Sequence, residues 1–542
     1  MKPAQRPHGF PRSLVSPRCV KVRSAIVTIS LVLLSWGLVF GQSSQEAQLH
    51  ADNGLKLMRD GDLPAAEAEV RKTLKLGPRD PTHLAELGVA LGIERKLAES
   101  DLYFQQALRF DPGNAPVRRN LAKNQWRLGD FESAEENLRE VLKAQPGDGE
   151  STLILGMVEV DLKHFAAAVR LLVSVPSLIK QHPESMDALA QSYYQPKNQP
   201  AARQTLRGLL QVNAPPGALY LGSQTALQAE DYSMAEELLA TAQPGYPDRA
   251  KLGYFLALSR YRAGKFSECQ DTVFNTLAAA PASRELCALL GWCFAQQDEI
   301  RQSINAFDQA LDLDPTDETT YLDLGRVLLD HHRDELAVLL GKETTTRFPN
   351  SYRAQMLLGA AQGDFGYLTD ALASFQRAVE LNPQSPEANF NLAMIQLAAG
   401  FADDALATLE RGIKNFPGDA QQYQEYASFQ VERAEEGDAR AEARAYDALH
   451  RAIALDHSLG RSHLLLGRLE LKNNRVEQAV SELETAAKLD PKDGLTHLLL
   501  SRAYTRSGKP DQAAKEAAIY KSSAQVEVRS GRLRTRSTLR RW

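Results

Sequence analysis

The sequence predicts an all-α fold, a right-handed superhelical solenoid of about fourteen helix-turn-helix units. Three observations lead to this prediction: prolines recur every 34 residues, glycine and alanine keep fixed distances from them, and the apolar residues in between have helical spacing. A length of 542 residues would suffice for three or four ordinary domains, but an internal repeat overrides that expectation. Hydrophobic content of 43% and charged content of 24% argue against disorder.

The prolines set the period and its phase. They stand at 78, 112 and 146, then at 247, 281, 315, 349, 383 and 417, and finally at 491. Every step within a group is 34 residues, whereas the first gap is three periods less one residue and the second is two periods plus six. The repeat therefore continues through one deletion and one insertion. Proline ends the helix before it because it has no backbone N–H to donate.

Small residues keep the same register as the prolines. Glycine lies 24 residues before six prolines, at Gly54, Gly88, Gly291, Gly325, Gly359 and Gly467. Alanine lies twelve residues before seven of them, at Ala66, Ala134, Ala235, Ala337, Ala371, Ala405 and Ala479. Because small side chains let two antiparallel helices approach closely, each period is interpreted as a pair of packed helices.

These Leu-Gly, Ala, Phe, Ala and Asp-Pro positions resemble the tetratricopeptide repeat (TPR) family. The resemblance covers residues 47–521 after a short linker at 42–46, is strongest at 352–385 and weakest at 183–249, and includes six extra residues in 420–459. Since one helix pair cannot bury its apolar stripe alone, successive pairs are expected to stack along a curved groove. The predicted units start at residues 47, 81, 115, 149, 183, 216, 250, 284, 318, 352, 386, 420, 460 and 494.

Residues 1–41 are expected to direct the chain out of the cytoplasm. Six basic residues precede an apolar run from Ala25 to Phe40, and the segment has no carboxylate. Two alternatives fit: a signal peptide cleaved before Gln42, or an N-terminal membrane anchor, since the run is slightly shorter than the roughly 20 residues that span a bilayer. Either places the remainder outside the cytoplasm, in the periplasm or secreted.

Without the six positive charges of residues 1–41, the formal net charge changes from -5 to -11, so the exported part is acidic and no nucleic-acid partner is expected. Residues 522–542 are predicted to be a basic, disordered tail. The tail is either a solvated extension or a weak electrostatic contact with an anionic membrane surface. Its positive charge is concentrated in Arg529, Arg532, Arg534, Arg536, Arg540 and Arg541.

Three cysteines follow the export segment: Cys269, Cys287 and Cys293. Cys287 and Cys293 are six residues apart on one predicted helix, so they point in different directions and cannot bridge each other. Two alternatives remain. Cys269 and Cys293 form a bridge between neighbouring helices, or all three are buried thiols that pack as small hydrophobic residues.

The resemblance implies that the first helix of each unit lines the concave groove, with its fifth, ninth and twelfth residues pointing inward. Tyrosine, tryptophan and methionine contribute strongly to binding at interfaces. The alternative is that neighbouring units of the superhelix cover these side chains. The predicted partner-binding residues are Trp126, Met157, Tyr194, Tyr220, Tyr254, Leu258, Tyr261, Trp292, Leu322, Met356, Phe390 and Met394.

The family's clamp of lysine and asparagine for a terminal carboxylate is not predicted. Arg119, Asn120 and Lys123 supply a fragment of it, but Ala85 and Val89 occupy the equivalent places one unit earlier.

No catalytic, cofactor or metal site is predicted. The motifs G-x-S-x-G, H-E-x-x-H and G-x-x-x-x-G-K-[ST] and a paired C-x-x-C are all missing from the sequence. His331 and His332 are adjacent in a turn, so their rings should diverge. His463 and His497 share the fourth place of successive units, which predicts packing residues.

The sequence therefore predicts a non-enzymatic protein-protein interaction scaffold outside the cytoplasm, with a partner peptide or helix bound in the groove. The alternative is a component of exopolysaccharide or envelope-polymer assembly or export that contacts glycan, because exposed aromatic rings such as Tyr220 and Trp292 can stack on sugars. Membrane contact is expected only through an uncleaved N-terminal segment or, weakly, through the C-terminal arginines.

Overall fold

The computed structural model describes residues 45–76 and 80–530, and the regular structure in these ranges consists of 29 helices and no strand. The all-α prediction with about fourteen helix pairs is confirmed. The predicted signal or anchor, residues 1–41, lies outside the described residues. Within the described ranges no helix combines the length and the apolar character that a bilayer span requires.

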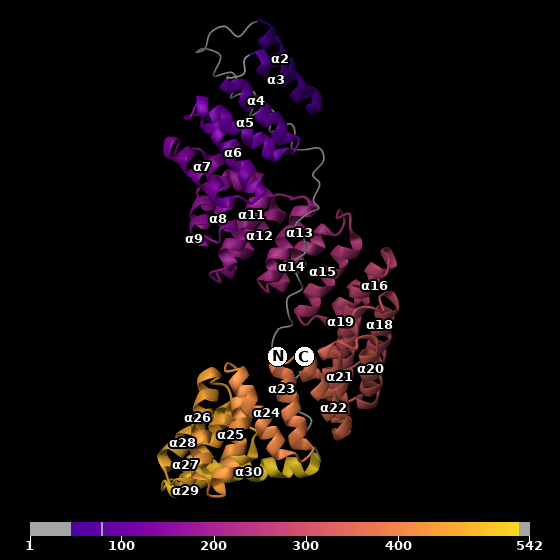
Figure 1. Cartoon of the computed structure of the whole chain (residues 1–542), viewed down its shortest axis with the longest axis vertical. Coiled ribbons are helices and arrows are strands. Elements are labelled where there is room, and N and C mark those ends of the chain that lie inside the picture. Colours follow the sequence, from indigo (N-terminus) through magenta and orange to yellow (C-terminus); the bar gives the residue numbers. More distant parts are fainter. Residues whose placement is uncertain (1–44, 77–79, 531–542) are drawn as a thin grey trace. The chain divides into compact units, whose positions relative to one another are not determined.

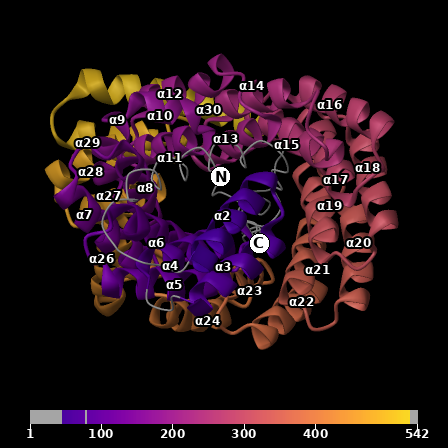
Figure 2. The same cartoon turned by 90° about the horizontal axis from the view of Figure 1, so that it is seen from above.

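The chain divides into two compact parts, Met1–Ala282 and Ser283–Trp542, called here the N-terminal half and the C-terminal half. In each half, helix pairs follow one another in chain order (Figure 1). Figure 2 shows how helices of the C-terminal half are arranged. Helices α17 (Arg284–Gln296), α19 (Glu318–Asp330) and α21 (Tyr352–Phe365) lie on the inner side of a curve, and α18 (Ile300–Leu313), α20 (Asp334–Arg347) and α22 (Leu368–Leu381) lie on its outer side.

The N-terminal half contains seven first helices and seven second helices, plus the short α10 (Pro176–Gln181). Its first helices are α2 (Gln45–Asp60), α4 (Pro81–Ile93), α6 (Ala115–Leu128), α8 (Gly149–Asp161), α11 (Pro183–Tyr194), α13 (Pro216–Gln228) and α15 (Arg249–Arg262). Its second helices are α3 (Leu63–Leu76), α5 (Leu97–Phe110), α7 (Phe131–Ala144), α9 (Phe165–Val173), α12 (Gln199–Gln211), α14 (Tyr232–Ala242) and α16 (Phe266–Ala279).

The C-terminal half contains seven further pairs. Its first helices are α17 (Arg284–Gln296), α19 (Glu318–Asp330), α21 (Tyr352–Phe365), α23 (Pro386–Ala398), α25 (Ala420–Glu435), α27 (Gly460–Lys472) and α29 (Gly494–Arg506). Its second helices are α18 (Ile300–Leu313), α20 (Asp334–Arg347), α22 (Leu368–Leu381), α24 (Ala402–Asn415), α26 (Ala439–Leu455), α28 (Val476–Leu489) and α30 (Pro510–Ser530). All fourteen first helices begin within two residues of a predicted unit start.

The repeat is irregular at Pro176 and in the six-residue insertion. Pro176 divides the second helix of the unit starting at 149 into α9 and α10, because proline cannot continue the α9 hydrogen-bond ladder. The insertion is shared between two helices, since α25 has 16 residues and α26 has 17, whereas the adjoining pair α23 and α24 has 13 and 14. Each helix of that pair is therefore about one turn longer.

The predicted disordered tail is corrected in part. Helix α30 continues to Ser530, nine residues beyond the predicted end of the repeats. Between Pro510 and Gly531 the sequence has no glycine or proline, so nothing in it ends the helix earlier. Residues 531–542 lie outside the described residues.

Four glycines of the repeat, Gly88, Gly291, Gly359 and Gly467, face a large side chain on the second helix, sixteen residues further along the chain. A Cβ atom added to Gly291 would lie 2.6 Å from the ring of Phe307, and one added to Gly88 would lie 2.6 Å from Phe104. The Phe307 side chain is completely buried. The glycine therefore lets the bulky residue insert between the two helices of its pair, and this contact forms the centre of these repeats.

The three cysteines after residue 41 differ in their bonding state. Cys269 and Cys293 are disulfide-bonded, and both side chains are buried. Cys287 is a free thiol, and its burial raises its pKa above the usual value. Cys287 is therefore a packing residue of α17.

We predict that replacing Gly291 by valine lowers the free energy of unfolding by about 1–3 kcal/mol, because the new side chain has no space beside Phe307. Urea denaturation of the full chain measures the change. Gly418→Ala in the same half is the control, since no atom lies within 4 Å of its added Cβ. Equal stability of the two variants would contradict the role given to the glycine contact.

Candidate functional site

The predicted groove residues of the N-terminal half all lie on first helices, and each is half-buried, with part of its side chain open to solvent. They are Trp126 on α6, Met157 on α8, Tyr194 on α11, Tyr220 on α13, and Tyr254, Leu258 and Tyr261 on α15. Figure 2 shows the first helices α6, α8, α11, α13 and α15, which carry these residues, on the inner side of the N-terminal half.

The C-terminal half differs, and the prediction for four of its residues is corrected. Trp292 on α17 is half-buried, but Leu322, Met356, Phe390 and Met394 have only 0–6% of their surface exposed. Leu322 and Met356 belong to the hydrophobic core around α17–α23, and Phe390 and Met394 to the core around α23–α27. Stacked neighbours cover them, which is the second of the two alternatives for such side chains. They stabilise the fold and are closed to a partner.

Aromatic rings gather where α13 and α15 meet the turn before α15. The ring centroid of Tyr220 lies 4.9 Å from that of Tyr246 and 5.7 Å from that of Phe255, and Tyr254 lies 5.2 Å from Phe255. The Lys251 ammonium lies 5.1 Å from the centroid of the Tyr220 ring. We call Tyr220, Tyr246, Tyr254 and Phe255 the aromatic cluster.

Tyr246 was missed by the sequence analysis because it lies in a turn, outside the helical register used to choose groove residues. Phe255 was missed because it is the sixth residue of its unit, outside the fifth, ninth and twelfth places used to choose groove residues. Burial of the Tyr220 ring raises its pKa, so its hydroxyl stays neutral in the physiological range. The aromatic cluster therefore offers half-exposed rings and neutral hydroxyl groups to a ligand.

Two other predicted groove residues are held by carboxylates of the next repeat. The indole Nε1 of Trp126 donates a hydrogen bond of 2.7 Å to Asp161, and the Tyr194 hydroxyl donates one of 2.9 Å to Asp231. Arg203 donates two hydrogen bonds of 2.6 Å to the same Asp231 carboxylate. Burial raises the pKa of Asp231, but the hydrogen bonds from Arg203 and Tyr194 outweigh it, so the net pKa is lowered. These rings are therefore fixed in position before any partner binds.

Trp292 is fixed by a similar arrangement in the C-terminal half. Its Nε1 lies 3.3 Å from Asp323, to which it donates a hydrogen bond, and the Arg326 guanidinium carbon lies 5.4 Å from the ring centroid. Burial raises the pKa of Asp323 to about 6, although the hydrogen bond from Trp292 opposes the shift. Trp292, Asp323 and Arg326 therefore form a polar group beside an indole on two successive first helices.

The histidines of the fourth place pack against glutamates of the second helix. His463 Nδ1 lies 2.6 Å from Glu482, and His497 Nδ1 lies 2.5 Å from Glu516, each pair being 19 residues apart. His50 and Glu69, also 19 residues apart, have the same contact at 2.6 Å. The predicted packing role is therefore supplemented by a polar contact within three of the pairs.

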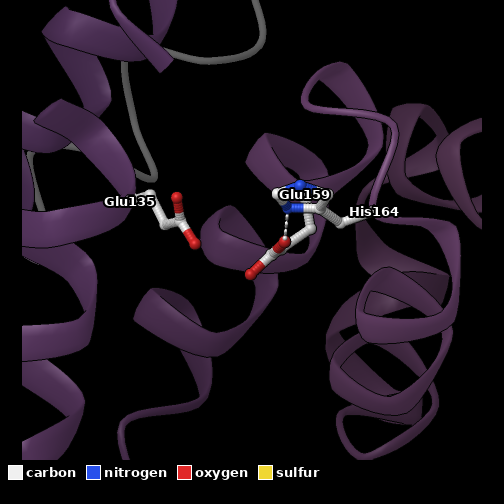
Figure 3. A group of neighbouring side chains, drawn as sticks. All are labelled: Glu135, Glu159 and His164. Carbon is white, nitrogen blue, oxygen red and sulfur yellow. Dashed lines mark hydrogen bonds and ion pairs between the residues drawn. The ribbon is translucent and has the colours of Figure 1, made fainter. Parts of the chain in front are cut away.

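One group of metal-ligating side chains among the described residues was not predicted. Glu135 on α7, Glu159 on α8 and His164 after α8 have ligand atoms within 4.8 Å of one another (Figure 3). His164 Nδ1 lies 2.9 Å from Glu159, while Arg139 forms ion pairs of 2.5 Å with Glu135 and 3.0 Å with Glu159. Arg139 pairs with both carboxylates, so the group is an ion-pair network of the repeat, although its donor atoms are ones that zinc accepts.

Stacked helix pairs with half-exposed rings on the first helices define a repeat protein of the interaction-module class. Sequence models described as tetratricopeptide repeats match residues 94–154 and 364–426, residues 52–115, 322–386 and 464–525, and residues 285–317. The chain belongs to the tetratricopeptide repeat family.

The chain is similar to tetratricopeptide repeat protein 33 of Mus musculus, with 36% identity over 93 residues, which is 17% of this chain and 36% of that protein. The Homo sapiens protein of the same name is 33% identical over 97 residues, 18% of this chain and 37% of the other. The match thus spans little more than a third of these relatives.

Two solved structures cover most of the chain. Yeast Tom70 is 15% identical over 89% of this chain and 96% of that chain, with a TM-score of 0.35. The APC/C hetero-tetramer Cut9-Hcn1 is 11% identical over 88% of this chain and 98% of that chain, with a TM-score of 0.35. Both TM-scores are low, so the assignment of the family rests on the sequence models and the helix pairs.

We predict that Asp323→Asn raises the free energy of unfolding by about 1–3 kcal/mol at pH 7, because a buried carboxylate is replaced by a neutral amide. Because folding raises the pKa of Asp323, its protonated carboxyl stabilises the folded state fully below the unfolded pKa of 3.8. This contribution to the free energy of unfolding is lost as the pH rises through the folded pKa of about 6. The gain should therefore disappear near pH 4. Urea denaturation across this range measures it, with the exposed Asp312→Asn as control; a gain that does not vary with pH would contradict the assignment.

Proposed function

We propose that this chain is a non-enzymatic protein-interaction scaffold that works outside the cytoplasm and binds an extended peptide or helix of a partner on its first helices. Family membership supports the general class, because repeats of this kind serve as protein-interaction scaffolds. The aromatic cluster of α13 and α15 carries the specific proposal. Half-exposed tyrosine rings at an interface supply large apolar area and hydroxyl groups that form hydrogen bonds.

The geometry of the aromatic cluster suits a peptide. Tyr220 is packed against Tyr246 and Phe255, so little conformational entropy is lost when its exposed face is covered. Lys251 lies over the same ring and places a positive charge beside it. The preferred ligand therefore presents an apolar side chain next to an acidic one.

Two features support the proposed location. Residues 1–41 combine six basic residues, an apolar run and no carboxylate, as export segments do. Disulfide-bonded Cys269 and Cys293 fit a compartment in which disulfides persist. The periplasm and the extracellular space both meet this condition.

The competing function is contact with a glycan during assembly or export of an envelope polymer. One observation favours it, since the exposed faces of Tyr220 and Tyr254 can stack on sugar rings as well as on peptide side chains. The two functions differ in the charge of the ligand, because a neutral glycan makes no use of Lys251.

We predict that the double variant Tyr220→Ala, Tyr254→Ala binds its peptides at least tenfold more weakly than the natural chain. Peptides selected from a random phage library against the natural chain serve as ligands, and calorimetry measures their affinity. Tyr232→Ala, on the second helix α14 of the same half, is the matched control and should bind normally. Selection of no peptide, combined with specific binding on a glycan array, would favour the polymer function.

We predict that the protein isolated from its natural host begins at Gln42 or retains residues 1–41 in a membrane fraction, and that labelling of free thiols after denaturation modifies neither Cys269 nor Cys293. Intact-mass spectrometry measures both the N-terminal residue of the chain and the number of labelled thiols. A soluble cytoplasmic chain with residues 1–41 intact and all its thiols reduced would contradict the proposed location.

A further inference from the structure

The residue that precedes the second helix is aromatic in two successive repeats. Ser, Thr, Asp and Asn are favoured there, since their side chains accept a hydrogen bond from the free N–H groups of the first turn. Tyr367 before α22 and Phe401 before α24 have aromatic side chains, and neither makes a capping hydrogen bond. The other recorded residues at this place are all polar or charged: Lys96, Asp130, His164, Asn198, Asp231, Lys265, Glu299, Arg333, Asp438 and Arg475.

These two aromatic residues are also exposed. Tyr367 has 50% of its surface open to solvent and Phe401 49%, and next to them Phe365 and Leu397 are each 41% exposed. The rings of Phe365 and Tyr367 lie 4.6 Å apart, centroid to centroid. We call Phe365, Tyr367, Leu397 and Phe401 the aromatic edge.

The two turns belong to adjacent repeats, whose helices α22 and α23 are in contact. Successive hairpins of a solenoid stack in the same orientation, so their turns lie on one edge, separated by roughly the 8–10 Å between packed helices. The aromatic edge is therefore a short row of exposed apolar groups. It lies at the turns and is separate from the aromatic cluster of the N-terminal half.

The repeats that carry the aromatic edge are strongly acidic. Between Arg353 and Arg411 the chain has one basic residue, Arg377, which forms an exposed ion pair with Glu380. The same stretch has seven carboxylates: Asp364, Asp370, Glu380, Glu387, Asp403, Asp404 and Glu410. Asp403 is 94% exposed and pairs with Arg433 of the next repeat, and Asp370 and Asp404 are exposed beside the turns. A ligand of the aromatic edge should therefore be basic and carry apolar side chains.

One segment of this chain has that composition. Residues 531–542, "GRLRTRSTLRRW", contain five arginines, two leucines and a tryptophan, and no side-chain carboxylate. We propose that residues 531–542 of one copy bind the aromatic edge of a second copy. Trp542, Leu533 and Leu539 would cover Tyr367 and Phe401, and the arginines would face the carboxylates beside the turns.

The length of residues 531–542 favours binding to a second copy over binding to the aromatic edge of the same chain. The repeats starting at 420 and 460 lie between the aromatic edge and the pair that ends in α30. At roughly 10 Å per stacked pair the separation is about 30–40 Å. Twelve residues span about 40 Å only when fully extended, so on its own chain the segment would have almost no length left to lie along the aromatic edge. Because the two binding surfaces are different, each copy can bind one neighbour at either end, which gives open chains of copies rather than closed dimers.

The test uses a synthetic peptide of residues 531–542 and the protein truncated after Ser530, with fluorescence anisotropy as the readout. We expect saturable binding that weakens as salt is added, because the contact is largely electrostatic. A control peptide with serine in place of Leu533, Leu539 and Trp542 should bind at least tenfold more weakly. Equal binding of the two peptides would overturn the proposal, because it would reduce the contact to non-specific charge attraction.

The matched protein variant is Tyr367→Ser, Phe401→Ser, which removes the rings and restores a favourable residue at each helix start. Its melting temperature should be equal to or higher than that of the parent, so weaker binding cannot be attributed to unfolding. Its peptide affinity should fall at least tenfold, whereas Leu102→Ser, on α5 and 57% exposed, should have no effect. Unchanged affinity of the double variant overturns the proposal.

Sedimentation of the full chain completes the test. The full chain should form a concentration-dependent series of oligomers, which both the truncation after Ser530 and the double variant abolish. If the peptide binds vesicles of anionic lipid but not the truncated protein, the arginines serve a membrane and the proposal is wrong. If a monomeric full chain refuses added peptide while the truncated chain accepts it, the segment binds its own chain, which overturns the choice of a second copy.

Discussion

Close contact between the two helices of one repeat is the constraint on which the structure depends. Where glycine on the first helix meets phenylalanine on the second, as Gly291 meets Phe307, there is no room for even one additional carbon atom. The contact fixes how each pair packs, yet it buries only part of each helix, so the remaining apolar surface must be covered by the next pair. The cores of both halves extend over several consecutive pairs for this reason.

Close stacking of neighbouring pairs also decides which side chains remain available for binding. Leu322 on α19 and Met356 on α21 are lost to the hydrophobic core that extends over α17 to α23. Where an aromatic ring is too large to be covered, as for Tyr220 and Trp292, part of it stays exposed and its polar atoms pair with nearby carboxylates or solvent. The same packing that stabilises the repeats thus leaves a few rigid rings on the surface, and rigid rings bind with little loss of entropy.

Much of the fold was predictable because the period and the helical spacing are both local properties of the sequence. The start of α8 at Gly149 and of α19 at Glu318 agrees with units counted from prolines alone. The break between α9 and α10 was visible only as Pro176, whose effect depends on where the preceding helix would otherwise end. The burial of Met356 was not predictable, since the same place in α15 holds the half-exposed Tyr254, and the sequence does not show which neighbouring side chains cover this place. Tyr246 could not be found because it lies in a turn, and groove residues were chosen by their place in the first helix of each unit. The unusual residues Tyr367 and Phe401 could have been found, since capping places can be aligned between repeats.

The central claim is that each half is a row of helix pairs that depend on their neighbours, with interaction surfaces on the rings they leave exposed. Hydrogen exchange of the natural chain, followed by mass spectrometry under native conditions, tests the claim most directly. Protection should be lowest in the terminal pairs and rise toward inner pairs of each half, because an end pair has a neighbour on one side only. Uniform protection lost in a single cooperative step across all helices would show a globular core and contradict the account.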